Sequence, residues 1–241
     1  IECGIVKLPR VPVADNLPVG DMPMYRNLWD HIGPRMPKKG RGKGSGELDP
    51  LSLPSELLTA LNALYSHYAK IFTEWDGVID VPPVFIVVCN NTSTSKLLYE
   101  WISGWDRPNE DGDPVNVHRG HLELFRNYDE YGNRLDRPKT LLIDSAQLES
   151  GEAMDQAFRD VAGPEREQFK RELIQRGGAG GQAVEDISDQ DLLREVMNTV
   201  GKPGRLGEAI RCVVSVSMLT EGWDANTVTH ILGIRAFGTQ L

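Results

Sequence analysis

The feature that most constrains this chain is a strand-like apolar run that leads directly into a polar turn. Residues 213–228 read VVSVSMLTEGWDANTV, and a second strand-like run at residues 228–234 follows at once. A buried strand that ends in hydroxyl, carboxylate and glycine groups is a common way for open α/β sheets to form ligand sites. We therefore expect the turn at residues 220–224 to be the chemical centre of the chain.

Other apolar runs predict further strands of the same sheet. Residues 84–89 (VFIVVC) are continuously apolar, which is typical of a strand covered on both faces. Residues 140–144 (TLLID) form a shorter run of the same kind. Cys89 and Cys212 fall inside strand-like runs, where we expect them to be small buried side chains.

Helical patterns alternate with these strands. Apolar residues from Leu57 to Trp75 recur with a 3.6-residue period, behind Pro54 and Ser55 as start signals, so they predict a core-facing helix. Further helices are predicted, and their ranges are one or two turns within 24–31, then 93–103, a charged stretch at 151–176, and 189–200. Alternating strands and helices predict an α/β fold with a mostly parallel sheet flanked by helices.

The chain divides into a linker and one large domain. Residues 1–50 are rich in proline and glycine and include the basic run KKGRGKGSG at 38–46, which predicts a linker. Residues 51–241 form the predicted domain. Within it, residues 105–139 are turn-rich and charged, with a possible hairpin through 117–125 and a turn at Gly132-Asn133, and we expect them to be a surface insert.

Composition limits the class of protein. The 241 residues carry a formal net charge of −9, which argues against a protein that coats nucleic acid, although a basic cluster at 35–43 leaves a local basic groove open. Three widely spaced cysteines fit a reducing compartment, and no secretory signal is present, so we expect a cytoplasmic protein. No apolar run approaches about 18 residues, so no membrane span is expected.

Common phosphate-binding motifs are absent from the sequence. A phosphate loop needs Gly-Lys followed by Ser or Thr, but Lys43 precedes Gly44 and Lys202 precedes Pro203. The glycines at 201–207 precede a strand instead of opening a helix, so they do not fit a dinucleotide-binding loop. We interpret both glycine-rich segments as linkers.

Metal and nucleophile motifs are also missing. His118 and His121 lack further clustered ligands, so we expect a surface pair and no metal site. No G-x-S-x-G segment is present. His230 lies in the last predicted strand, where a hydrogen-bonded core or edge histidine is the expected role.

Two polar turns follow predicted strands, at residues 90–92 and 220–224. In a parallel sheet the carboxyl ends of strands share one edge, so both turns can face one ligand. Hydroxyl, amide and backbone N–H groups suit phosphate oxygens, Asp224 could accept a hydrogen bond from a ribose hydroxyl, and Gly222 permits close backbone approach. From the residues alone, ordinary helix caps explain these turns equally well.

Four segments together resemble a known helicase family. SMLTEGWDANTVTHILGIRAFGTQL (217–241) resembles motif V of superfamily 2 helicases, specifically the Res subunit of type III restriction enzymes and related DEAD/DEAH-like helicases. VPPVFIVVCNNTSTSKLLYEWISG (81–104) resembles motif IV, and residues 140–153 and 192–215 resemble the intervening segments. The resemblance covers nearly the whole chain and implies a RecA-like, P-loop NTPase-type second lobe.

The resemblance also implies roles for individual residues. Glu221, Gly222 and Asp224 match the (R/E)-G-x-D core of motif V, so they would line the nucleotide cleft. Asn90, Thr92 and Ser217 would contact the backbone of double-stranded DNA, although Ser217 does not match the usual threonine-type position cleanly. Such contacts are independent of base sequence and sensitive to salt.

The chain departs from the family in lacking two catalytic parts. The first RecA-like lobe, with its phosphate-loop lysine and Mg²⁺ ligands, and the arginine-rich motif VI are absent, and the chain lacks an initiator methionine. We therefore expect a piece of a longer protein, truncated C-terminally and inactive alone. ATP and Mg²⁺ would be cofactors of the full protein, with the Mg²⁺ ligands outside this chain.

The first lobe of the same protein is an implied partner, as is a methyltransferase subunit where the system has one. Whether a nuclease domain follows is not specified by the sequence. Two alternatives remain: a catalytically silent nucleic-acid-binding or protein-interaction module, and a stand-alone α/β nucleotide-binding enzyme.

Overall fold

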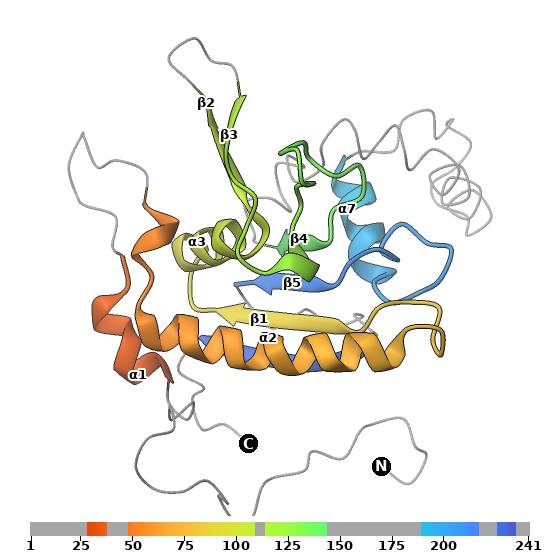
Figure 1. Cartoon of the computed structure of the whole chain (residues 1–241), viewed down its shortest axis with the longest axis horizontal. Helices are drawn as coiled ribbons and strands as arrows, with labels where there is room; N and C mark the ends of the chain where they lie inside the picture. Colours follow the sequence, from red (N-terminus) through yellow and green to blue (C-terminus); the bar gives the residue numbers. More distant parts are fainter. Residues whose placement is uncertain (1–27, 38–47, 109–113, 144–188, 217–225, 235–241) are drawn as a thin grey trace, which may run out of the picture.

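A four-stranded parallel sheet forms the centre of the structure (Figure 1). The computed structural model describes residues 28–37, 48–108, 114–143, 189–216 and 226–234. The strands of the sheet are β1 (Val84–Cys89), β4 (Thr140–Ile143), β5 (Cys212–Ser215) and β6 (Val228–Ile234). Their order is β4-β5-β1-β6, and every pair is parallel. The predicted α/β class with a parallel sheet is confirmed.

Helices on one face of the sheet bury the wider core. Helix α2 (Ser55–Trp75) runs alongside β1 in Figure 1, and its buried side chains include Leu57, Leu61 and Tyr68. Helix α3 (Thr92–Ser103) covers the same face, and the short α1 (Leu28–Ile32) contributes two buried side chains. The 3.6-residue period of the sequence therefore predicted the buried stripe of α2 correctly.

The opposite face is covered by α7 (Asp189–Asn198) and by the loop that follows it. Val84, Ile86 and Val88 of β1 point to this side, whereas Phe85, Val87 and Cys89 point to α2 and α3. Because both sets are buried, all six residues of β1 must be apolar. This explains why VFIVVC is a continuous run without the alternation of a half-exposed strand.

The two cysteines predicted to be buried, Cys89 and Cys212, are both fully buried free thiols. Burial raises the pKa of each thiol above its ordinary range. Neither is a reactive nucleophile in the folded chain.

The predicted hairpin at 117–125 is wrong. The hairpin is formed instead by β2 (Trp105–Pro108) and β3 (Pro114–His118), which pair antiparallel and project from the sheet (Figure 1). Residues after β3 fold back on α3, where the His121 N–H donates to the carbonyl of Trp101 at 3.0 Å. The apolar positions in 117–125 therefore pack inward and do not pair as strands.

This return path places part of the expected surface insert in the core. Leu122 and Phe125 are 1% and 0% exposed and join the cluster formed by α2, α3 and the sheet. Gly120 has φ +89°, and a Cβ at this position would lie 2.5 Å from the carbonyl oxygen of Ile102. Glycine is thus required where the chain passes the end of α3.

The described residues also form short 3-10 helices at Gly33–Arg35, Pro50–Ser52 and Glu123–Phe125. The predicted helix at 151–176 and the basic run at 38–46 lie outside the described residues.

The packing of α2 yields a stability prediction. Leu61→Ala should lower the free energy of unfolding by about 2–5 kcal/mol, because Leu61 is fully buried and truncation leaves a cavity. Leu51→Ala is the matched control, since Leu51 is 50% exposed and should change stability by less than about 0.5 kcal/mol. Urea unfolding of both variants measures the difference. Equal losses would contradict the assigned orientation of α2.

Candidate functional site

The carboxyl ends of β1 and β5 lie side by side at one edge of the sheet. Val88 of β1 pairs with Ser215 of β5, and both strands run in the same direction. The segments that follow, beginning at Asn90 and Val216, therefore leave the sheet at neighbouring points. The turn at residues 90–92 therefore starts at this edge, whereas residues 217–225 lie outside the described residues.

The turn after β1 combines a helix cap with exposed polar groups. The Asn91 side chain caps α3, because its Oδ1 accepts a hydrogen bond from the Thr94 N–H at 2.8 Å. Asn90 and Thr92 are exposed, and Asn90 Oδ1 accepts from the Asn91 side-chain amide at 3.0 Å. Asn91 is thus the structural residue of this turn, and the two predicted DNA contacts beside it have accessible side chains.

The other predicted site residues, Ser217, Glu221, Gly222 and Asp224, lie outside the described residues. Their assignment stays a prediction.

The histidines form stacked contacts. His118 stacks on Trp105 and His121 on Trp101, with ring centroids 4.2 Å and 4.4 Å apart. Within the residues that the structure describes, no three His, Cys, Asp or Glu side chains come together as metal ligands would. The pair is best explained by packing on the two tryptophans.

His230 is a buried, hydrogen-bonded histidine on β6. Its Nε2 lies 2.8 Å from Nδ1 of His67, its Nδ1 lies 2.8 Å from the Thr229 hydroxyl, and its ring stacks on Phe85. Burial lowers the pKa of His230, and the nearby His67 lowers it further. These surroundings therefore favour the neutral form of the His230 imidazole over the charged form.

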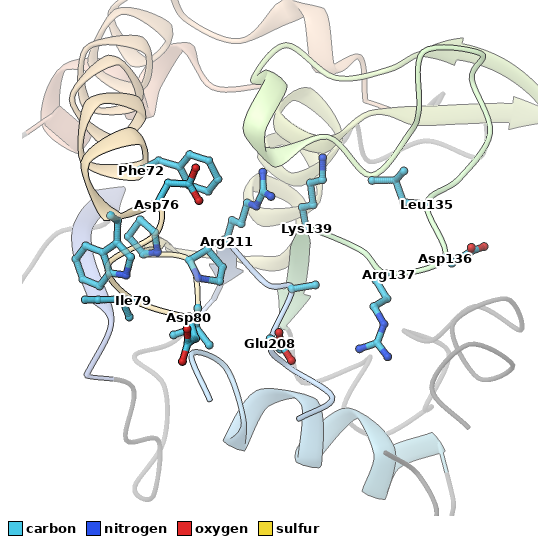
Figure 2. Close-up of a pocket in the computed structure, with 15 residues that line it drawn as sticks. Phe72, Asp76, Ile79, Asp80, Leu135, Asp136, Arg137, Lys139, Glu208 and Arg211 are labelled. Atoms are coloured by element: carbon cyan, nitrogen blue, oxygen red, sulfur yellow. The ribbon is translucent and has the colours of Figure 1, made fainter. Parts of the chain in front are cut away.

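A cavity of about 820 Å³ lies at the opposite, amino edge of the sheet (Figure 2). Its lining comes from the end of α2 and from the segments that precede β1, β4 and β5. The lining residues are Phe72, Trp75, Asp76, Ile79, Asp80, Val81, Pro82, Pro83, Leu135, Asp136, Arg137, Lys139, Glu208, Ala209 and Arg211. This volume falls in the range of small-molecule sites.

Two cations of this cavity occupy equivalent positions on neighbouring strands. Lys139 precedes Thr140 and Arg211 precedes Cys212, and these last two residues are partners in the β4–β5 ladder. The Arg211 N–H donates to the carbonyl of Lys139 at 2.8 Å. Figure 2 shows both side chains extending in the same direction into the cavity. The strand register thus brings two positive charges together.

Burial and mutual repulsion act on this pair. Burial lowers the pKa of Lys139, and the charge of Arg211 lowers it further. Burial also lowers the pKa of Arg211. The Arg211 guanidinium lies 4.6 Å from the Phe72 ring centroid, and its Nη1 donates to the Leu124 carbonyl at 3.3 Å. The Arg211 head is therefore fixed in place.

The sequence analysis did not find this cavity. A signal is present, since RPKTLLID and AIRCVVS each place a basic residue directly before a strand. That signal becomes useful only when β4 and β5 are known to be neighbours.

None of the helices in the described residues has the length and apolar character that crossing a bilayer requires. No protein-family model, curated protein or solved structure matches the chain.

His230 yields a pH prediction. Its pKa in the folded chain lies below the ordinary value of about 6.5, so the unfolded chain binds more protons in mildly acidic solution. The stability linked to this group is present above about pH 6.5 and is lost as the pH falls through the folded-state pKa. His230→Gln should therefore lose less free energy of unfolding than the wild type between about pH 7.5 and about pH 5.

Urea unfolding at the two pH values measures this difference. His31→Gln is the control, since His31 is exposed on α1. An unchanged pH dependence in His230→Gln would contradict the assigned environment.

Proposed function

We propose that this chain is the second RecA-like lobe of an ATP-dependent DNA helicase or translocase of the type III restriction Res kind. The observation that carries the proposal is the pairing of β1 with β5, in which Val88 lies opposite Ser215. This pairing places the carboxyl end of β1, which belongs to the motif IV-like segment, beside Ser215, two residues before the motif V-like segment in the sequence. A site that uses both segments needs this adjacency.

In the proposed mechanism, the carboxyl edge closes on a first lobe that holds the triphosphate. Glu221, Gly222 and Asp224 face the nucleotide cleft, and the Mg²⁺ ligands lie outside this chain. Bound ATP would supply the energy of domain closure. This lobe would contribute hydrogen-bonding groups and the DNA-contacting surface that moves when the lobes close.

Asn90 and Thr92 are suited to the DNA side of this mechanism. Both are exposed at the carboxyl edge, and both are uncharged. A hydroxyl or amide N–H can donate to a phosphate oxygen without distinguishing bases. The rigid cap made by Asn91 fixes the start of α3 and therefore the position of Thr92 beside it.

Asp224→Ala tests the nucleotide side in the protein that carries both lobes. DNA-stimulated ATP hydrolysis should fall roughly tenfold or more, because a hydrogen bond to a charged group contributes about 1.5–3 kcal/mol. Asp30→Ala is the matched control, since Asp30 is an exposed carboxylate on α1. Unchanged hydrolysis with a folded lobe would rule out the role of Asp224, and ATP turnover by this chain alone would favour a stand-alone enzyme.

Thr92→Ala tests the DNA side. Loss of one neutral hydrogen bond of about 0.5–1.5 kcal/mol should weaken DNA binding by roughly two- to tenfold, to the same extent on every sequence. Thr73→Ala, at an exposed position of α2, is the control. Fluorescence anisotropy with two unrelated duplexes measures the effect. A loss confined to one sequence, or equal in both variants, would contradict a backbone contact.

A further inference from the structure

Lys139 and Arg211 are two of the three cations that line the amino-edge cavity, with Arg137 as the third. Ion pairs among the described residues include those of Arg35 with Glu56, Lys96 with Glu100 and Arg134 with Asp106. Neither Lys139 nor Arg211 forms an ion pair with any described residue. Partly buried charges of the same sign are costly to hold together unless an anion compensates them.

Arg211 also has a donor without an acceptor. Its Nε–H is buried and has no hydrogen-bond partner among the described residues, whereas buried donors in proteins are nearly always paired. Packing on Phe72 and the bond from Nη1 to Leu124 account for the orientation of the guanidinium. They do not account for the lysine placed beside it.

We propose that this cavity binds a small phosphomonoester, with its phosphate between the Arg211 guanidinium and the Lys139 ammonium. A phosphomonoester carries a charge close to −2 at neutral pH and offers several acceptor oxygens. The planar fork of arginine and the point charge of lysine both suit such a group. A dianion balances the two cations, whereas one carboxylate balances only one.

The other residues of the lining favour a small ligand with an apolar organic group attached to its phosphate. Phe72, Ile79, Pro82 and Pro83 provide apolar walls for an organic body. Asp80 and Glu208 lie further along the cavity in Figure 2, Asp76 lies beside Phe72, and these carboxylates repel a polyanion such as DNA. The site therefore favours a compact anion on an apolar group over a nucleic-acid backbone.

The site is separate from the proposed DNA and nucleotide surface. Lys139 and Arg211 precede β4 and β5, whereas Asn90 and Thr92 follow the end of β1. The two proposals can therefore fail independently. Thr92→Ala should leave phosphomonoester binding unchanged.

Calorimetric titration of the full chain with phenyl phosphate tests the proposal. The wild type should show saturable binding, tighter than binding of inorganic phosphate, which lacks the apolar body. Lys139→Gln should weaken binding roughly tenfold, since it removes a charged hydrogen bond. Lys202→Gln is the matched control, because Lys202 is exposed and does not line the cavity.

Arg211→Gln should weaken binding more than Lys139→Gln does. If the Arg211 variant fails to fold, the result for Lys139→Gln alone decides the test. Benzoate identifies the acidic group: weaker binding than phenyl phosphate supports the assignment, and equal or tighter binding overturns it. Absence of saturable binding, or equal affinity in wild type and Lys139→Gln, would also overturn the proposal.

A second readout follows from the lysine itself. Bound phosphate should raise the pKa of Lys139, which burial and Arg211 lower in the free chain. Phenyl phosphate should therefore slow reductive methylation of Lys139 and leave that of Lys202 unchanged. Equal rates with and without the ligand would count against contact at Lys139.

Discussion

The enclosure of β1 is the constraint on which the rest of the structure depends. Its two edges are paired with β5 and β6, and its two faces are covered by α2 and α3 on one side and by α7 on the other. No side chain of this strand reaches solvent, so each of its six positions requires an apolar residue. Polar chemistry is therefore confined to the two ends of the strand.

The two ends offer different chemistry. At the carboxyl edge, the described residues Asn90 and Thr92 present exposed neutral side chains beside a capped helix. At the amino edge, strand register fixes Lys139 and Arg211 beside each other above apolar walls. The α/β sheet thus separates a surface suited to an extended ligand from a cavity suited to a compact one.

Local pattern predicted the strands of the parallel sheet and the helices α2, α3 and α7. The run VFIVVC has the same bounds as β1, and Asn91 was among the residues expected to cap α3. Periodicity records which side chains face the core, but it does not record which strands are neighbours. The order β4-β5-β1-β6 brings Lys139 and Arg211 together across more than seventy positions of sequence, so the cavity could not be predicted. The hairpin was misplaced for a related reason. Leu122 and Phe125 are apolar because they pack in the core with α2 and α3, and not because they pair as strands.

The two buried thiols can report whether the sheet has opened. Cys89 on β1 and Cys212 on β5 have no exposed surface, and burial keeps them protonated. Oxidants and alkylating reagents act on accessible thiolates, so neither sulfur can react while the strands remain packed. Chemical modification of either sulfur consequently shows that the packing around β1 and β5 has opened at least once.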